Sequence, residues 1–389
     1  MEKIIRKIAA AADEPALFDD APLLDAPPAP AVVDSVLKAT AKALPRSVRL
    51  GTSTWSFPGW RGIVYAPSTG ERRLASEGLA AYSHYPIFRT VGLDRNFYRA
   101  LSADAYAAFA GQVPEDFRFL VKAPREVTDP YLRTAAGRPR APNPHYLDAA
   151  LAASSFLAPV AAGLGDKAGP LVFQFSPFPH AELRSTEAKA AALERMGDFF
   201  EALRKHPAAS GRLLCAEFRN YELLTPRALM MLRDCGIRPV LGLHPAMPGA
   251  RRQMAALRYY ETGVRSADFG GSWRFSGPLV IRWSLAAHQF FDTARRDWAP
   301  YSQIVAADPA TRALLASLIV RAAQSGVESY MVANNKAEGC APKTMRAVAE
   351  QTADMWRTAQ IQEAAQARAE VLRREAEAVK KAAAASAHS

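Results

Sequence analysis

Residues 213–220 of this chain place a carboxylate and a guanidinium at the end of an apolar stretch, an arrangement that can carry acid–base chemistry. In a β-strand, alternate side chains point to opposite faces, so Cys215, Glu217 and Arg219 share one face. A buried carboxylate can act as a general acid or base, and a guanidinium can bind an anion through paired hydrogen bonds. A purely structural ion pair is the other interpretation of the same pattern.

Polar residues also stand at the ends of other apolar stretches, and they would meet this pair if those stretches were parallel strands. To catalysis we assign Glu217, Lys122 and Asp94. To substrate binding we assign Arg219, Arg282, Gln174, His244, Asn334, Asn335, Tyr98 and Trp55. The structural alternatives are an exposed lysine at a strand end for Lys122 and a cover over the barrel for Trp55. Since cations and amides outnumber carboxylates in this set, we predict a small anionic ligand such as a phosphate, a carboxylate or a nucleotide.

Metal-dependent and nucleophilic catalysis are the alternative chemistries. Barrel hydrolases hold divalent metals with Glu, Asp and His from strand ends. Here only Glu217, His244 and Asp94 could serve, and no HxH or HExxH motif occurs, so we predict neither a metal nor another cofactor. Cys340 follows a glycine before a predicted helix, where a thiolate would be favoured, but a buried thiol is the commoner outcome.

The elements that must position these residues alternate along the chain between strands and helices. Apolar, β-prone stretches predict strands over residues 48–53, 89–93, 117–123, 171–175, 213–220, 239–243, 279–283 and 329–333. Helical spacing predicts helices over residues 74–85, 146–162, 186–206, 225–235, 251–260, 309–325 and 342–356. This alternation predicts an α/β fold, a (β/α)8 TIM barrel, in which the carboxyl ends of the strands carry the chemistry. A doubly wound sheet could absorb most of the same elements.

Composition divides the chain into a barrel and two flanking segments. Residues 1–46 are rich in Ala and Pro, which predicts a poorly ordered extension with short helices over 4–12 and 33–43. We predict the barrel over residues 47–357. Residues 358–389 are rich in Ala, Glu, Lys and Arg and predict a solvent-exposed helical tail. Residues 130–144 are too rich in proline for a regular element and predict a long insertion above the third strand.

Charge and cysteine content limit the partners and the compartment. The net charge of +11 is compatible with nucleic acid or anionic metabolites, although the basic residues are scattered. Three cysteines without CxxC spacing favour a reducing cytoplasm. The N-terminus lacks the pattern of a signal peptide, and no run approaches the ~18 apolar residues that span a bilayer. We therefore predict a cytoplasmic protein that does not bind membranes.

A series of motifs resembles, in order, those of the YecE-like family, also called domain of unknown function 72. The motifs are GTSTW at 51–55, NFYR at 96–99, FRFLVKAP at 117–124, Gln174 near a proline, EFR at 217–219 and NNKAEGCAP at 334–342. The resemblance implies a β/α barrel without an established activity. This chain departs from the family pattern at Gly92, where a carboxylate is common, at Ala333 and at Asn220.

Three functional hypotheses follow. The first is an enzyme that binds a small anionic or phosphorylated substrate at the barrel mouth, with Glu217 as the general acid–base. The second is a metal-dependent phosphodiesterase or endonuclease. The third is a non-catalytic module that binds nucleic acid or protein.

Overall fold

The computed structural model describes residues 25–135, 137–265 and 272–386 of the 389-residue chain. Within these residues, parallel strands close into a barrel in the order β1-β10-β9-β8-β7-β6-β3-β2. The strands are β1 (Val48–Thr52), β2 (Phe88–Leu93), β3 (Arg118–Lys122), β6 (Ala168–Gln174), β7 (Leu214–Glu217), β8 (Arg238–Leu243), β9 (Leu279–Trp283) and β10 (Ser329–Ala333). Each predicted strand is present, and the predicted α/β TIM barrel is confirmed.

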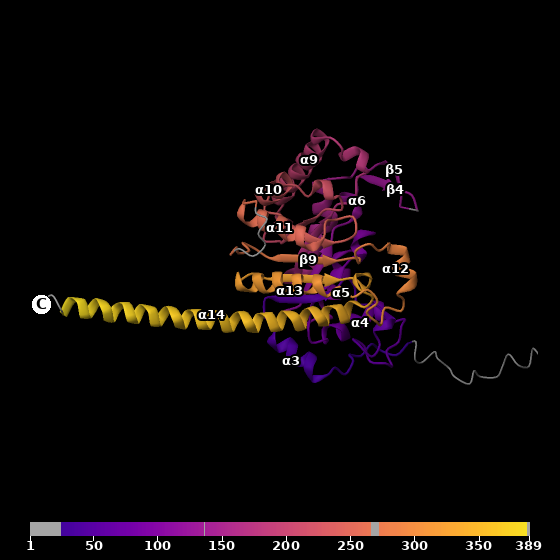
Figure 1. The fold of residues 1–389 in the computed structure, drawn as a ribbon. Helices are drawn as coiled ribbons and strands as arrows, with labels where there is room; N and C mark the ends of the chain where they lie inside the picture. Colours follow the sequence, from indigo (N-terminus) through magenta and orange to yellow (C-terminus); the bar gives the residue numbers. More distant parts are fainter. Residues whose placement is uncertain (1–24, 136, 266–271, 387–389) are drawn as a thin grey trace, which may run out of the picture.

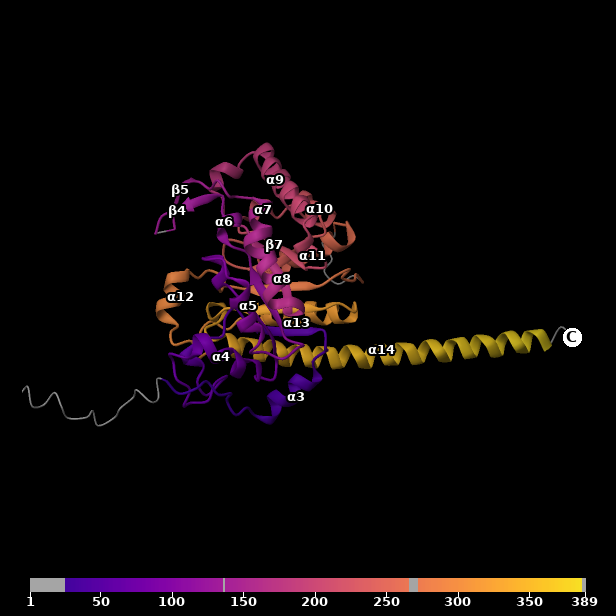
Figure 2. The ribbon, with the colours of Figure 1, turned by 180° about the vertical axis from the view of Figure 1, so that it is seen from behind.

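Helices follow the strands and cover the outside of the barrel (Figures 1 and 2). They are α3 (Ser35–Ala43), α4 (Leu74–Ser83), α5 (Ala103–Ala110), α6 (Arg125–Thr128), α7 (Ala149–Ala152), α8 (Ala158–Leu164), α9 (Thr186–Arg204), α10 (Pro226–Asp234), α11 (Ala250–Thr262), α12 (Phe291–Asp297), α13 (Pro309–Gln324) and α14 (Ala341–Ser386). Side-chain caps fix several starts: Ser185, Thr225 and Asp308 each accept a hydrogen bond from the backbone N–H three residues on. The predicted helix over residues 4–12 lies outside the described residues.

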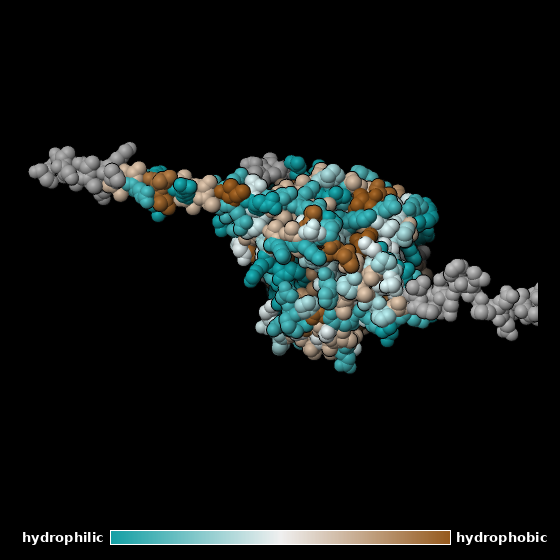
Figure 3. Space-filling view, turned by 90° about the horizontal axis from the view of Figure 1, so that it is seen from below, coloured by the Kyte–Doolittle hydropathy of each residue, from teal (hydrophilic) through white to brown (hydrophobic). Residues whose placement is uncertain are grey.

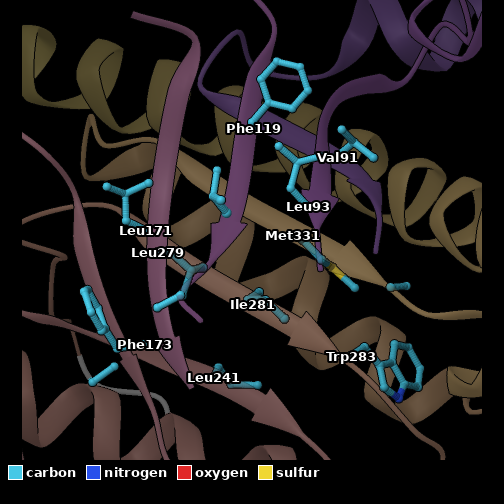
Figure 4. Packing of buried hydrophobic residues seen from close by; sticks show 14 of the residues in the cluster. Val91, Leu93, Phe119, Leu171, Phe173, Leu241, Leu279, Ile281, Trp283 and Met331 are labelled. Atoms are coloured by element: carbon cyan, nitrogen blue, oxygen red, sulfur yellow. The ribbon is translucent and has the colours of Figure 1, made fainter. Parts of the chain in front are cut away.

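Alternation along the strands separates two hydrophobic layers. The outward side chains, including Val91, Phe119, Phe173 and Ile281, pack under the helices (Figure 4). The inward side chains form a separate buried cluster of Leu120, Val172, Cys215, Val280 and Val332. Because this inner cluster is dry and closely packed, the barrel axis is a core, and polar chemistry is confined to its ends.

The segment between β3 and α7 corrects the prediction of an insertion without regular structure. Strands β4 (Tyr131–Arg133) and β5 (Pro139–Pro142) form an antiparallel hairpin there. The sequence hides this hairpin because proline removes a backbone donor and is tolerated only at strand edges. Arg133 anchors the hairpin to the barrel through paired hydrogen bonds to Asp129, with Nε–Oδ2 and Nη2–Oδ1 distances of 2.6 and 3.0 Å.

The described part of the N-terminal segment packs against the barrel. Leu37 of α3 is buried, and the carboxylate of Asp34 pairs with the guanidinium of Arg346 on α14 at 2.6 Å. Residues 1–24 lie outside the described residues, and the division of the chain at residue 46 stays a prediction.

The C-terminal segment forms one continuous helix, where we predicted a closing helix followed by an exposed one. The first turns of α14 bury Met345, Val348 and Ala349 against the barrel. Its later turns run past the body of the molecule into solvent (Figures 1 and 3). At 1.5 Å per residue its 46 residues span about 69 Å.

One helical stretch, Ala149–Lys167, is long and apolar enough to cross a membrane by length and composition alone. Buried helices of soluble proteins share these properties. Here Phe156, Val160 and Leu164 of this stretch are buried, and α8 packs against α5 and β6. The predicted cytoplasmic location stays a prediction.

Candidate functional site

The carboxyl ends of the strands carry a polar layer directly above the apolar inner cluster. Lys122, Gln174, Glu217 and Arg282 each follow a residue of that cluster by two positions: Leu120, Val172, Cys215 and Val280. Since side chains two apart on a strand share a face, all four polar residues point into the barrel. The strand pattern therefore brings together residues that lie far apart in the sequence.

Glu217 is the centre of this layer and is only 1% exposed. Its Oε1 lies 2.7 Å from Arg219 Nη2, and its Oε2 forms an ion pair with Arg282 Nη1. Gln174 Oε1 accepts hydrogen bonds from the same two nitrogens at 2.9 and 3.1 Å. On its other side, Arg282 Nη2 donates to Asp94 Oδ1 at 3.1 Å. The two carboxylates and the two guanidinium groups thus form one connected network.

The charges around Glu217 determine its protonation state. Burial opposes ionisation, but the positive charges of Arg219 and Arg282 outweigh it and hold the pKa of Glu217 below its ordinary value. At neutral pH Glu217 is a carboxylate that holds two guanidinium groups in place. It lies beneath the cavity described below and does not line it, so the geometry does not favour our prediction of a general acid–base at this residue.

Lys122 differs from the other cations of the layer because no carboxylate of the described residues lies within ion-pair distance of it. Its side chain is buried, and Nζ lies 3.4 Å from the centroid of the Phe97 ring. Burial lowers the pKa of Lys122 to about 7, with Arg282 and Arg219 adding to the effect and Asp94 opposing it. An amine with such a pKa can both give and take a proton at neutral pH.

His244 completes the polar layer as a neutral ring. Burial, followed by the charge of Arg219, lowers its pKa to about 4. Its Nδ1 accepts a hydrogen bond from the N–H of Ala246 at 3.1 Å, which assigns the ring proton to Nε2. His244 can therefore donate a hydrogen bond to a ligand without carrying a charge.

These residues surround an open cavity of about 340 Å³ at the barrel end, which we call the mouth cavity. Its lining includes eight predicted site residues: Asp94, Tyr98, Lys122, Gln174, Arg219, His244, Arg282 and Asn334. It also includes Ser53, Phe97, Ser284 and Phe291, which the sequence analysis missed. Ser53 and Ser284 follow the same strand parity and could have been found. Phe97 lies in a short turn and Phe291 begins the short helix α12, and neither stretch carries a clear periodic signal.

Two residues predicted to bind substrate do not reach the mouth cavity. Trp55 is buried beside α4, and its indole N–H donates to the carbonyl of Leu74 at 3.1 Å. Asn335 is also buried, and its Oδ1 accepts from the indole N–H of Trp60 at 3.2 Å and from the N–H of Ala341 at 2.9 Å. Both side chains form hydrogen bonds within the buried fold, so the structure does not favour these two assignments.

Cys340 is buried as well and lines neither of the two cavities described in this section. Burial raises the pKa of its thiol, which leaves little thiolate at neutral pH. The arrangement does not favour a nucleophilic cysteine.

A second cavity of about 400 Å³ adjoins the mouth cavity beneath the β4–β5 hairpin, and we call it the hairpin cavity. Phe97 and Tyr98 line both cavities. The charged and imidazole side chains of the hairpin cavity are Arg99, Arg125, Glu126, Asp129, Arg133, Arg140 and His145. Four of them are arginines and only two are carboxylates, so this cavity is basic.

The donor set does not fit a divalent metal. The described residues contain no group of three or more His, Cys, Asp and Glu side chains arranged to hold an ion. The two carboxylates of the polar layer, Glu217 and Asp94, both bind Arg282, whose charge would compete with a cation at their oxygens.

Comparison with known proteins finds a family but no activity. The sequence matches the family model described as "Protein of unknown function DUF72" over residues 49–369. The structure is similar to that of a DUF72 family protein from Enterococcus faecalis V583, with a TM-score of 0.50 and 15% identity over 78% of this chain and 95% of that chain. A DUF72 family protein from Thermotoga maritima MSB8 gives a TM-score of 0.48 and 19% identity over 79% and 98%. No curated protein matches the sequence.

Proposed function

Because this chain belongs to the DUF72 family of proteins of unknown function, we propose an activity from the mouth cavity alone. The protein is an enzyme that binds a small anionic substrate in this cavity, and Lys122 is the group that exchanges a proton with it. The observation that carries the proposal is a buried amine that lines the cavity without a carboxylate partner of its own among the described residues.

The charge balance of the polar layer supports an anionic substrate. The positive charges of Arg219 and Arg282 are balanced by the carboxylates of Glu217 and Asp94, with which they pair. Protonated Lys122 therefore adds one positive charge that nothing in the layer neutralises. A bound phosphate or carboxylate would neutralise it, and burial would strengthen the attraction.

The remaining cavity groups provide donors that suit an anion. The described contacts of Arg219 to Glu217, Gln174 and Ser284 all use Nη2, which leaves Nη1 for a ligand. His244 can add its Nε2 proton. In this proposal Glu217 is a positioning residue that orients both guanidinium groups, and Lys122 gives or takes the proton of the reacting group.

The first test measures the binding of inorganic phosphate and of pyruvate by isothermal titration calorimetry between pH 6 and pH 9. Because only protonated Lys122 supplies the extra charge, the affinity for pyruvate, which stays a monoanion over this range, should be highest below pH 7 and should weaken by up to tenfold per pH unit above the pKa of Lys122, which is about 7. Phosphate gains a second negative charge near pH 7, so its affinity is compared with that of Lys122→Met at each pH. Lys122→Met should bind weakly at every pH. Lys343→Met, which removes an exposed lysine of α14, should match the wild type.

Catalysis is tested by incubating the protein with phosphate monoesters and with hydroxy and keto acids, and by following turnover with ¹H and ³¹P NMR. Turnover should occur in the wild type and should be lost in Lys122→Met. Binding that is independent of pH and unchanged in Lys122→Met would contradict the proposal. Salt-sensitive association with nucleic acid or protein without any turnover would instead support a binding module.

A further inference from the structure

We propose that the substrate is a short single-stranded oligonucleotide, with one phosphate in the mouth cavity and the next against the arginines of the hairpin cavity. This inference deepens the proposed function and rests on it. Three observations lead to it: exposed aromatic rings at the rim, arginines in the second cavity that form no ion pair with the described residues, and the shared wall between the two cavities.

Exposed aromatic rings gather at the rim of the mouth cavity. Tyr98 is 72% exposed and Phe291 is 53% exposed, and both line this cavity from different loops. Phe290, next in the chain, is 79% exposed. Large aromatic rings are rarely left in water without a partner, and a nucleobase can stack on such rings whatever its sequence. The rim therefore suits a ligand that carries flat rings as well as negative charge.

The hairpin cavity contains cations that no carboxylate of the described residues neutralises. Arg133 is engaged by Asp129, and the Arg125 guanidinium lies 5.9 Å from the centroid of the Tyr98 ring. Arg99 and Arg140, in contrast, form no ion pair with the described residues and are exposed. Two free guanidinium groups next to an aromatic ring form the combination that binds the backbone and a base of a single strand.

The shared wall joins the two cavities into one binding groove. Phe97 and Tyr98 line both, so a ligand bound in the mouth cavity is in contact with the entrance to the hairpin cavity. These two rings pack edge to face, with centroids 5.3 Å apart. This packing holds the Tyr98 ring in position between the two cavities. A single small anion would fill only the mouth cavity, whereas a chain of nucleotides uses both cavities and the ring between them.

The decisive experiment measures the affinity of fluorescently labelled tetrathymidylate with a 5′ phosphate by anisotropy, beside inorganic phosphate and tripolyphosphate by calorimetry. Tyr98→Ala should weaken oligonucleotide binding by about tenfold to a hundredfold, the loss of one base–aromatic stack, and this loss should be much larger than any change in phosphate binding. Tyr98→Phe should retain the affinity. Tyr221→Ala removes another exposed ring (55%) that lines neither cavity, and it should have no effect.

The charge contribution is measured with Arg99→Gln/Arg140→Gln. Each lost phosphate contact should reduce the slope of log affinity against log salt by about 0.7, so this double variant should lose about 1.4. The charge-matched control is Arg357→Gln/Arg368→Gln on the exposed part of α14, which should keep the wild-type slope.

The outcomes separate the two proposals. If phosphate binds and depends on Lys122 but tetrathymidylate binds no more tightly, the nucleotide inference fails and the proposed function stands. If tripolyphosphate matches tetrathymidylate and Tyr98→Ala has no effect, the groove binds charge alone and the inference fails. If neither phosphate nor tetrathymidylate binds the wild type, both proposals fail. Circular dichroism of each variant checks that it is folded.

Discussion

Glu217 illustrates how a sequence pattern can place a residue inside the barrel without showing how deep it lies. Alternation along β7 places it inside the barrel above Cys215, as predicted. Alternation does not show how far a side chain lies below the mouth cavity, because that depends on which side chains of the neighbouring strands cover it. Arg219 and Arg282 lie between Glu217 and the mouth cavity, so this carboxylate organises the site from below.

Glu217→Gln should therefore act first on stability. The change leaves buried Arg219 without its counter-charge and Arg282 with Asp94 alone, and the loss of a buried partner costs about 3–5 kcal/mol of the free energy of unfolding. Urea denaturation at pH 7 measures this difference. The control Glu77→Gln, which breaks an exposed ion pair with Arg73, should change stability little. Equal stability of Glu217→Gln and the wild type would show that the network is not structural.

The difference in stability between the wild type and Glu217→Gln should depend on pH. The pKa of Glu217 is lower in the folded protein than its ordinary value of 4.5, so its stabilising effect is fully present above that value. The effect is lost as the pH falls through the lower, folded pKa. The difference in the free energy of unfolding between the wild type and Glu217→Gln should consequently stay constant above pH 4.5 and narrow as the pH falls below it.

Asp94 provides a carboxylate near the position where the family pattern has one and this chain has Gly92. The family resemblance leads one to expect a carboxylate at residue 92, but a Cβ there would lie 2.9 Å from the backbone oxygen of Ser53 and 3.0 Å from its Cα. Asp94, two positions further on the same strand face, provides the carboxylate that binds Arg282. The missing acidic group therefore does not leave Arg282 without a partner.

At the scale of the elements, the sequence predicts the barrel strands well because each combines a short apolar run with turn residues after it. The helices missed were α5, α6 and α12. In α5 the sequence ADAYAAFA is so rich in alanine that its apolar residues show little contrast between faces, although Ser102 caps its start. The hairpin was missed because its strands are short and β5 begins and ends with proline. Its arginines and the turn residue Phe97 form much of the proposed groove, so the least predictable elements contribute most to that site.

Gly242 on β8 tests how closely the elements fit around the network. A Cβ at this position would lie 3.1 Å from Glu217 Oε1 and 3.2 Å from its Cγ. Gly242→Ala should therefore displace Glu217 and lower the free energy of unfolding by about 1–3 kcal/mol, the usual cost of overpacking a core. In Gly111→Ala the new Cβ would meet nothing nearer than 3.5 Å, and stability should be kept. Denaturant titration measures the stability of both variants. If Gly242→Ala is as stable as the wild type, the close packing of Gly242 against Glu217 is contradicted.

At the scale of the whole molecule, the barrel and the end of α14 should be energetically separate. The described side chains after Ala365 are exposed apart from Glu370, and they bury no apolar surface against the barrel. A chain that ends at Ala365 should keep the melting temperature of the full chain, as measured by differential scanning calorimetry. A chain that ends at Gly339 loses the buried residues of α14 and should not fold. A lower melting temperature for the chain that ends at Ala365 than for the full chain would show that the tail supports the barrel.

The closure of the barrel has a consequence for how the protein is synthesised. Strand β1 pairs with β10, which joins Val48 to Ser329, so the cylinder cannot close until almost all of the barrel sequence has been translated. The 46 residues of α14 come after β10. While the last of them are being added at the ribosome, the complete set of strands has already moved ahead toward open solvent. The nascent barrel can therefore close while the residues of the long helix are still being added.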